Sequence, residues 1–151
     1  MTWTRLAATI AVACVVPLAV VACGESENEE FKEDYNAAVE PLRELSEDIG
    51  SSIGGAAGKS NDQIAKEFEK LADKAQETRD NLSELEPPDD ANESFDKLLA
   101  SLKQGIDDLR AVAQAAKDGD PAAARQASED LIASGREIRQ AERELREAVD
   151  G

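Results

Sequence analysis

The chain has 151 residues and a formal net charge of −16, from 33 acidic and 17 basic side chains. A surface this acidic repels nucleic acid and anionic lipid headgroups, and it favours cations or basic partners. The sequence has no histidine, and Met1 is its only methionine, so histidine-containing di-iron sites, ordinary zinc sites and thioether copper sites lack their usual ligands.

Residues 1–22 have the layout of a secretory leader. Arg5 is followed by an uncharged run over residues 6–23, with small residues before Cys23. The run is at the short limit for a spanning helix, and Pro17 would remove a backbone hydrogen bond where no water can replace it. We therefore expect a cleaved leader rather than a permanent membrane span.

The end of this leader resembles the lipobox of bacterial lipoproteins, in which an aliphatic residue, a small or aliphatic residue and Ala or Gly precede a cysteine. Val20, Val21, Ala22 and Cys23 fit that pattern, although leucine is commoner where Val20 stands. The resemblance implies cleavage before Cys23, a thioether-linked diacylglycerol on its sulfur and acylation of its new amino group, for example with palmitate. It also implies a lipid-anchored protein on the extracytoplasmic face of the cell membrane.

The chain after the leader divides into an acidic tether, residues 23–30, and a helical domain, residues 31–151. The tether is polar and acidic, so we expect an extended segment that reaches about 20 Å at about 3.3 Å per residue. With Cys14 in the leader and Cys23 lipidated, no cysteine is left for a disulfide.

The domain contains four stripes of apolar residues at spacings of three and four, which is typical of amphipathic helices. They cover residues 31–53, 64–85, 95–112 and 124–149. Between them, Ser60 and Gln63 form a potential capping box. Asp120 and Pro121 supply a cap and a first-turn proline for the last helix.

These stripes predict an all-α fold, an antiparallel up-down bundle of four helices. Pro41 removes one amide hydrogen bond inside the first stripe. The first helix should therefore kink or restart there, and a bundle of three helices with a kinked or detached first helix is the alternative. Many stripe positions are alanine, so the core should be thin.

Motifs for cofactor chemistry are missing. Gly58, Lys59 and Ser60 resemble the end of a phosphate-binding loop, but Ile53 stands where that loop needs glycine. A serine nucleophile would need a base, and the carboxylates and lysines lie at ordinary spacing on polar helix faces. We therefore expect no enzyme, no bound nucleotide, no metal and no other cofactor.

Two features of the helices are less easily explained. Arg136, Arg139, Arg143 and Arg146 share one stripe of the fourth helix, where they either pair with the acidic first helices or face a partner; the acidity of those helices favours pairing. Glycines inside helices, Gly105 and Gly135, indicate either close helix contact or room for a small ligand.

The lipobox, the proline-rich junction at residues 85–88, the Gly119-Asp120 turn and the Ala/Glu/Arg-rich helices are together similar to the small helical lipoproteins of actinobacteria. That resemblance implies an envelope location and brings no activity with it. Our leading hypothesis is a non-enzymatic, membrane-tethered module, either structural or for protein interaction, that contacts another envelope protein or a wall component. The alternative is a lipoprotein that holds a small apolar or cationic ligand between its helices, for which a continuous cavity near Gly105 and Gly135 would be favourable.

Overall fold

The computed structural model describes the backbone of residues 23–151 and the side chains of residues 28–151. The expected leader, residues 1–22, lies outside this part of the chain. Cys23 is the first residue of the first helix, but its side chain is not described either. Cleavage of the leader and lipidation of Cys23 therefore stay predictions.

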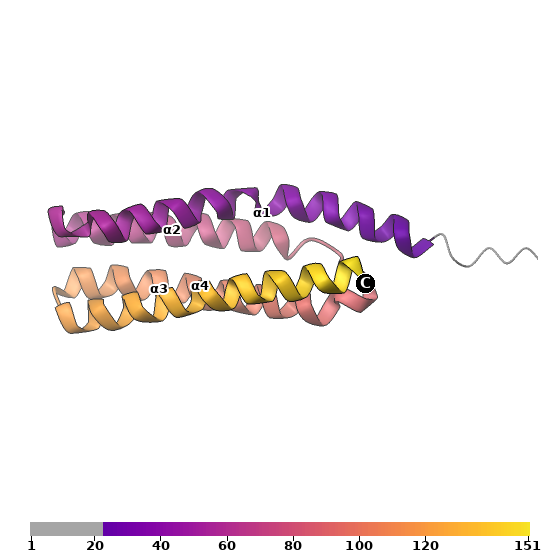
Figure 1. The fold of residues 1–151 in the computed structure, drawn as a ribbon. Coiled ribbons are helices and arrows are strands. Elements are labelled where there is room, and N and C mark those ends of the chain that lie inside the picture. The colour runs from indigo at the N-terminus through magenta and orange to yellow at the C-terminus, as the bar shows by residue number, and fades with distance from the viewer. Residues whose placement is uncertain (1–22) are drawn as a thin grey trace, which may run out of the picture.

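Four long helices form an antiparallel up-down bundle (Figure 1). They are α1 (Cys23–Gly55), α2 (Asn61–Leu82), α3 (Asn92–Asp118) and α4 (Pro121–Asp150), with two single-turn 3-10 helices, η1 (Ala56–Gly58) and η2 (Asp89–Ala91). No strand occurs between residues 23 and 151. The start of α1 and the end of α4 lie at the same end of the bundle. The predicted all-α four-helix architecture is confirmed.

Local capping signals place the ends of the helices. The Ser60 side chain accepts a hydrogen bond from the Gln63 amide, and the Gln63 side chain accepts one from the Ser60 amide. Asp120 accepts from two amides in the first turn of α4, directly before Pro121. Gly119 ends α3 with φ of 63°, a left-handed conformation that glycine adopts without a steric penalty. The predicted caps at Ser60 and Asp120 are confirmed.

The expected extended tether is wrong, because residues 23–30 form the first two turns of α1. As a helix this segment is about 12 Å long, at about 1.5 Å per residue. Its glutamates are good helix formers, and Asn28 Nδ2 donates to the carbonyl of Val149 at 3.1 Å. That bond ties Asn28 to the end of α4, and the part of α1 before it extends beyond that end of the bundle (Figure 1).

Pro41 does not end α1, which continues through it to Gly55. Val39 before the proline and Leu45 after it are both buried, the first in one core cluster and the second in the other. A proline inside a helix costs about 3 kcal/mol, and burial of two large apolar side chains offsets that amount. The alternative with a detached first helix is therefore wrong.

The core consists of two apolar clusters along the bundle. The first contains Phe31, Tyr35, Val39, Leu82, Ala91, Phe95, Leu98, Leu102, Ala141, Leu145 and Val149. The second contains Leu45, Phe68, Leu71, Ala72, Ala75, Ile106, Leu109, Val112, Ala113, Ala127 and Leu131. α3 packs extensively against α2 and α4, and α1 packs mainly against α2. α1 and α4 make few contacts. They are joined near the start of α1, where Asn28 bonds to Val149 and Lys32 pairs with Asp150, and the seam between them is open further along.

A buried polar contact joins α3 to α4 within this core. The Asp108 carboxylate is buried, and it accepts hydrogen bonds from Ser134 Oγ and from Gln104 Nε2, the latter at 2.9 Å. Ser134 Oγ also contacts the carbonyl of Asp130 at 3.1 Å. A buried carboxylate is costly unless donors satisfy it, so a pairing of α3 and α4 that brings Ser134 to Asp108 is favoured. This contact sets the register of the two helices.

Glu67 of α2 connects the end of α1 to the loop that follows it. Ser52 Oγ donates to Glu67 at 2.6 Å, and Lys59 Nζ lies 2.5 Å from its other oxygen. The Lys59 ammonium and then the Ser52 hydroxyl hold the pKa of Glu67 below its ordinary value of 4.5. Lys59 and Ser60, the residues that resembled a phosphate-binding loop, therefore serve the connection between two helices.

We expect this contact to make stability depend on acid pH. The pKa of Glu67 is lower in the folded than in the unfolded chain, so its contribution is fully present above the unfolded value and is lost as the pH falls through the folded value. The free energy of unfolding, measured with urea from neutral pH downwards, should fall less steeply below about pH 4.5 in Glu67→Gln than in the native chain. Glu77→Gln, at an exposed position on the same helix, should keep the native slope. Equal slopes for the native chain and Glu67→Gln would contradict this prediction.

Candidate functional site

The open seam between α1 and α4 forms an apolar groove of about 690 Å³. Large apolar side chains form both walls and the floor. They are Leu42, Leu45, Ile49 and Ile53 from α1, Leu131, Ile132 and Ile138 from α4, and Leu102, Ile106 and Leu109 from α3. Small-molecule sites in proteins typically have volumes of about 300 to 1,000 Å³ and mostly apolar walls. The groove therefore has the size and the lining of a ligand site.

The groove is accessible at the end that lies nearest to the α1–α2 connection, where two large apolar side chains are exposed to solvent. Ile53 of α1 is 37% exposed and Ile132 of α4 is 48% exposed. They are the most exposed large apolar residues in the described part of the chain, and both line the groove. Single exposed apolar residues are common, but two on facing walls of one apolar groove indicate a contact surface.

The two helix-interior glycines both line this groove, for different reasons. A Cβ at Gly105 would lie 3.1 Å from Cδ1 of Ile138, so this glycine lets α3 and α4 approach each other. A Cβ at Gly135 would meet only the end of the Arg139 side chain, at 3.7 Å. The expected close helix contact is confirmed at Gly105, whereas Gly135 leaves space in the wall of the groove.

The expected internal pairing of the arginine stripe is wrong. Arg136, Arg139, Arg143 and Arg146 are all exposed, and none of them forms an ion pair with another side chain of residues 28–151. Pairing was expected because the first two helices are acidic, but α1 makes few contacts with α4. The carboxylates of α1 therefore do not reach the stripe.

The structure divides this stripe into two pairs. Arg139 and Arg146 line the groove, on either side of Glu142. Arg136 and Arg143 do not line it, because the rotation of about 100° per residue places them further around the helix. The opposite rim carries Glu47 and Arg43, and Arg43 lies 3.1 Å from Glu40. The groove-lining part of α4 thus carries two arginines and one glutamate.

A second, smaller hollow of about 190 Å³ continues the seam towards the start of α1. Arg146 lines both spaces, and Tyr35 lines the smaller one. Tyr35 is 4% exposed, and its hydroxyl has no hydrogen-bond partner within the described residues. Burial, with Glu142 adding and Arg146 opposing, raises the pKa of Tyr35 to about 12. The hydroxyl is therefore protonated, and it is a hydrogen-bond donor without an acceptor among the described residues.

Removing this hydroxyl should stabilise the protein. A buried donor without a partner costs about 1 to 3 kcal/mol, and phenylalanine keeps the ring that stacks on Phe31 with ring centroids 5.8 Å apart. We expect Tyr35→Phe to raise the free energy of unfolding by about 1 kcal/mol in urea titrations. Tyr35→Leu, which also removes the ring, should lower it. A loss of stability in Tyr35→Phe would mean that the hydroxyl is satisfied, and it would contradict this prediction.

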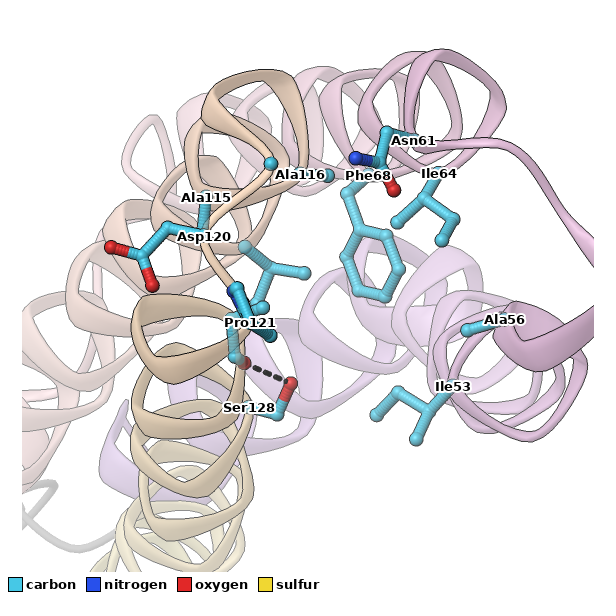
Figure 2. Close-up of a pocket in the computed structure, with 13 residues that line it drawn as sticks. Ile53, Ala56, Asn61, Ile64, Phe68, Ala115, Ala116, Asp120, Pro121 and Ser128 are labelled. Atoms are coloured by element: carbon cyan, nitrogen blue, oxygen red, sulfur yellow. Dashed lines mark hydrogen bonds between the residues drawn. The ribbon is translucent and has the colours of Figure 1, made fainter.

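A third hollow, of about 380 Å³, lies at the opposite end of the bundle, between the α1–α2 and α3–α4 connections (Figure 2). Ile53 lines both this hollow and the groove. The polar side chains in it make local bonds: Ser128 Oγ donates to the carbonyl of Ala124 at 2.7 Å, drawn dashed in Figure 2, and Asp120 caps α4. Phe68 and Ile64 contribute apolar surface. This hollow extends the apolar surface at the end of the groove nearest to the α1–α2 connection.

The acidic surface of the chain is concentrated elsewhere. A shallow depression of about 840 Å³ over the α2–α3 connection is lined by Asp34, Glu84, Glu86, Asp89 and Asp90, among others. Within residues 28–151, no three acidic or cysteine side chains come close enough together to hold a metal ion. This depression therefore has the properties of a solvated acidic surface.

Within residues 23–151, no helix combines the length and the apolarity that are needed to cross a bilayer. Comparison with known proteins finds no matching family model, no matching curated protein and no matching solved structure. The geometry of the groove is consequently the main guide to function.

The sequence did not reveal the groove or the unsatisfied Tyr35 hydroxyl. Tyr35 has the spacing of an ordinary core residue, and nothing in its neighbours along the chain indicates that its hydroxyl lacks a partner. Gly105 and Gly135 were the sequence signals, because a helix-interior glycine needs a reason, and both line the groove. Of the candidate site residues, the structure brings Arg139, Arg146 and Gly135 together at the groove and leaves Arg136 and Arg143 outside it.

Proposed function

We propose that the protein is a non-enzymatic bacterial lipoprotein, anchored through Cys23 on the extracytoplasmic face of the cell membrane, that binds an elongated apolar ligand between α1 and α4. The observation that carries the proposal is the groove of about 690 Å³ lined by Gly105 and Gly135. It favours ligand binding over the alternative of a module with a filled core. The lining favours an apolar ligand over a cationic one, because most of it is apolar and Arg139 and Arg146 balance the two carboxylates, Glu47 and Glu142.

Burial of an alkyl chain supplies the driving force for such binding. Each methylene transferred from water to an apolar site contributes about 0.8 kcal/mol. The binding of a flexible chain costs entropy, so several methylenes must be buried before binding is measurable. The walls formed by Leu42, Ile49, Leu131 and Ile138 provide apolar contact along the whole groove.

Photolabelling in bacterial membranes that contain the full chain tests the groove. A hexadecanol analogue with a photoreactive group on its chain should label peptides of α1 and α4 that include Ile53, Ile132 or Ile138. Unmodified hexadecanol should prevent that labelling. Labelling spread evenly over all four helices, or insensitive to unmodified hexadecanol, would overturn the proposal.

Mass spectrometry of the purified protein tests the anchor separately. The expected product begins at Cys23 and carries a diacylglycerol thioether and an acylated amino group. Cys23→Ala should retain the leader, because the acyl acceptor is missing. A native chain that is unacylated, or that still begins at Met1, would overturn the lipoprotein assignment and leave the groove unaffected.

A second candidate function is supported by Arg136 and Arg143. Both are exposed outside the groove, and neither forms an ion pair within residues 28–151. Arg136 and Arg143 are about two helical turns apart. Two unpaired positive charges at this spacing can pair with carboxylates on an acidic surface of another envelope protein. Crosslinking of membranes that contain the native chain or an Arg136→Gln/Arg143→Gln variant tests this function. A partner that is captured equally by both would argue against it.

A further inference from the structure

Polar groups without partners gather at one end of the α1–α4 seam. They are the guanidinium groups of Arg139 and Arg146, which make no ion pair within residues 28–151, and the buried hydroxyl of Tyr35. Arg146 lies where the groove meets the small hollow that Tyr35 lines. The opposite end of the groove, at Ile53 and Ile132, is apolar. The seam is therefore polar at one end and apolar at the other.

From this polarity we infer that the ligand is a long-chain carboxylate whose acid group contacts Arg139, Arg146 and the Tyr35 hydroxyl and whose alkyl chain extends towards Ile53 and Ile132. The inference rests on the proposed function, because it names the class of molecule that the groove takes. Hydrogen bonds between guanidinium groups and carboxylates are among the strongest in proteins. A carboxylate would also satisfy the Tyr35 hydroxyl, which lacks a partner in the described structure.

The other charged groups at this end leave a positive excess for an acid. Glu142 lies on the rim between Arg139 and Arg146, so this part of α4 carries one net positive charge. In the small hollow, Lys32 Nζ lies 2.8 Å from Asp150, which neutralises it. Glu47 lines the groove on the opposite wall, so over the whole groove two carboxylates balance the two arginines, and the positive excess is confined to the part of α4 between Arg139 and Arg146. Electrostatics therefore favours a negatively charged head.

The dimensions of the groove favour one alkyl chain. Along α1 the groove extends from Val39 to Ile53, a helical rise of about 21 Å at about 1.5 Å per residue. A lipid chain in a bilayer spans about 15 Å, half of a hydrocarbon core of about 30 Å, so the groove is long enough. A methylene is about as large as a water molecule, about 30 Å³. The 690 Å³ of the groove therefore holds about 20 methylenes, enough for one long chain and too few for the two chains of a phospholipid.

A helix from a partner protein fits the same space less well. A helix about 21 Å long and about 10 Å in diameter occupies about 1,600 Å³, more than twice the 690 Å³ of the groove. Such a helix could place only its side chains inside.

Competition photolabelling of the full chain in membranes tests the inference. The probe is a photoreactive palmitate analogue, and the competitors are palmitate, hexadecanol and hexadecylamine. We expect palmitate to compete at a concentration about tenfold lower than hexadecanol, which corresponds to one charge-assisted contact. Hexadecylamine should be the weakest. Arg139→Gln/Arg146→Gln should raise the half-effective palmitate concentration about tenfold and leave that of hexadecanol within about twofold.

Two matched variants control for general effects of the substitutions. Arg136→Gln/Arg143→Gln removes the same charge from the same helix outside the groove, and it should leave palmitate competition within about twofold. Tyr35→Phe keeps the ring and should weaken palmitate several-fold more than hexadecanol. An equal loss for the two arginine pairs would mean a general charge effect and would overturn the inference.

The outcomes separate this inference from the proposed function. If palmitate and hexadecanol label the groove and compete equally, the carboxylate inference is overturned while groove binding stands. If neither protects α1 and α4, the proposed function fails with it. Displacement of the probe by phosphatidylglycerol or by an acidic amphipathic helical peptide, but not by palmitate, would also overturn the inference of a single-chain acid.

Discussion

Replacing Leu98 with alanine is expected to lower the free energy of unfolding by about 3 kcal/mol. Leu98 is 0% exposed and lies in the first core cluster, on the helix that packs against both α2 and α4. Truncation removes buried methyl groups and leaves a cavity, because three surrounding helices cannot collapse into it together. Urea unfolding followed by helical circular dichroism measures the change.

A neighbouring leucine provides the control for this substitution. Leu99 is only partly buried and packs at the edge of the same cluster. Leu99→Ala places the same alanine in the helix as Leu98→Ala does, but it removes less buried apolar surface. It should therefore lower the free energy of unfolding by less than about 1.5 kcal/mol. Equal losses for Leu98→Ala and Leu99→Ala would contradict the assigned packing of α3, because they would mean that both positions contribute equally to the core.

Replacing Gly135 with leucine is expected to weaken groove binding by about thirtyfold to a hundredfold. A Cβ at Gly135 meets only the end of Arg139, so the new side chain enters the groove without a clash with the backbone. It displaces about three methylenes of ligand, each contributing about 0.8 kcal/mol. The free energy of unfolding should not fall, because leucine is a better helix former than glycine by up to about 1 kcal/mol. Competition photolabelling measures the affinity, and urea unfolding measures the stability.

The matched control places the same side chain outside the groove. Ala133 is exposed on α4 and does not line the groove, so Ala133→Leu should leave binding within about twofold. If Gly135→Leu binds the hexadecanol probe as tightly as the native chain, the site is not the groove between α1 and α4. If it unfolds more easily than the native chain, Gly135 has a packing role like that of Gly105.

Features that depend on near neighbours in the chain could be predicted from the sequence. The capping box of Ser60 and Gln63 and the Asp120 cap involve residues no more than three positions apart. The apolar stripes likewise follow from the helical period, and most of their residues are buried. Gly105 was correctly assigned to a close helix contact, because glycine inside a helix is unfavourable unless something needs the space.

Features that depend on which helices touch could not be predicted in the same way. The arginine stripe was assigned to internal ion pairs because the chain is acidic, but that assignment requires α1 to pack closely on α4. Residues 23–30 have no apolar stripe, so their helical state follows from glutamate propensity and from a bond to Val149, far away in the sequence. The continuation of α1 through Pro41 likewise depends on burial against other helices.

The sequence by itself determined that the domain is helical, where two of the helices begin, and which chemistry its side chains lack. It also carries the lipobox pattern that predicts the anchor on Cys23. Only the tertiary structure decided that a groove is open between α1 and α4, and that Arg146 lies between this groove, which Arg139 lines, and the hollow that Tyr35 lines. Helical periodicity specifies which face of each helix is apolar, but it does not specify how completely two apolar faces cover each other. The site exists because that coverage is incomplete.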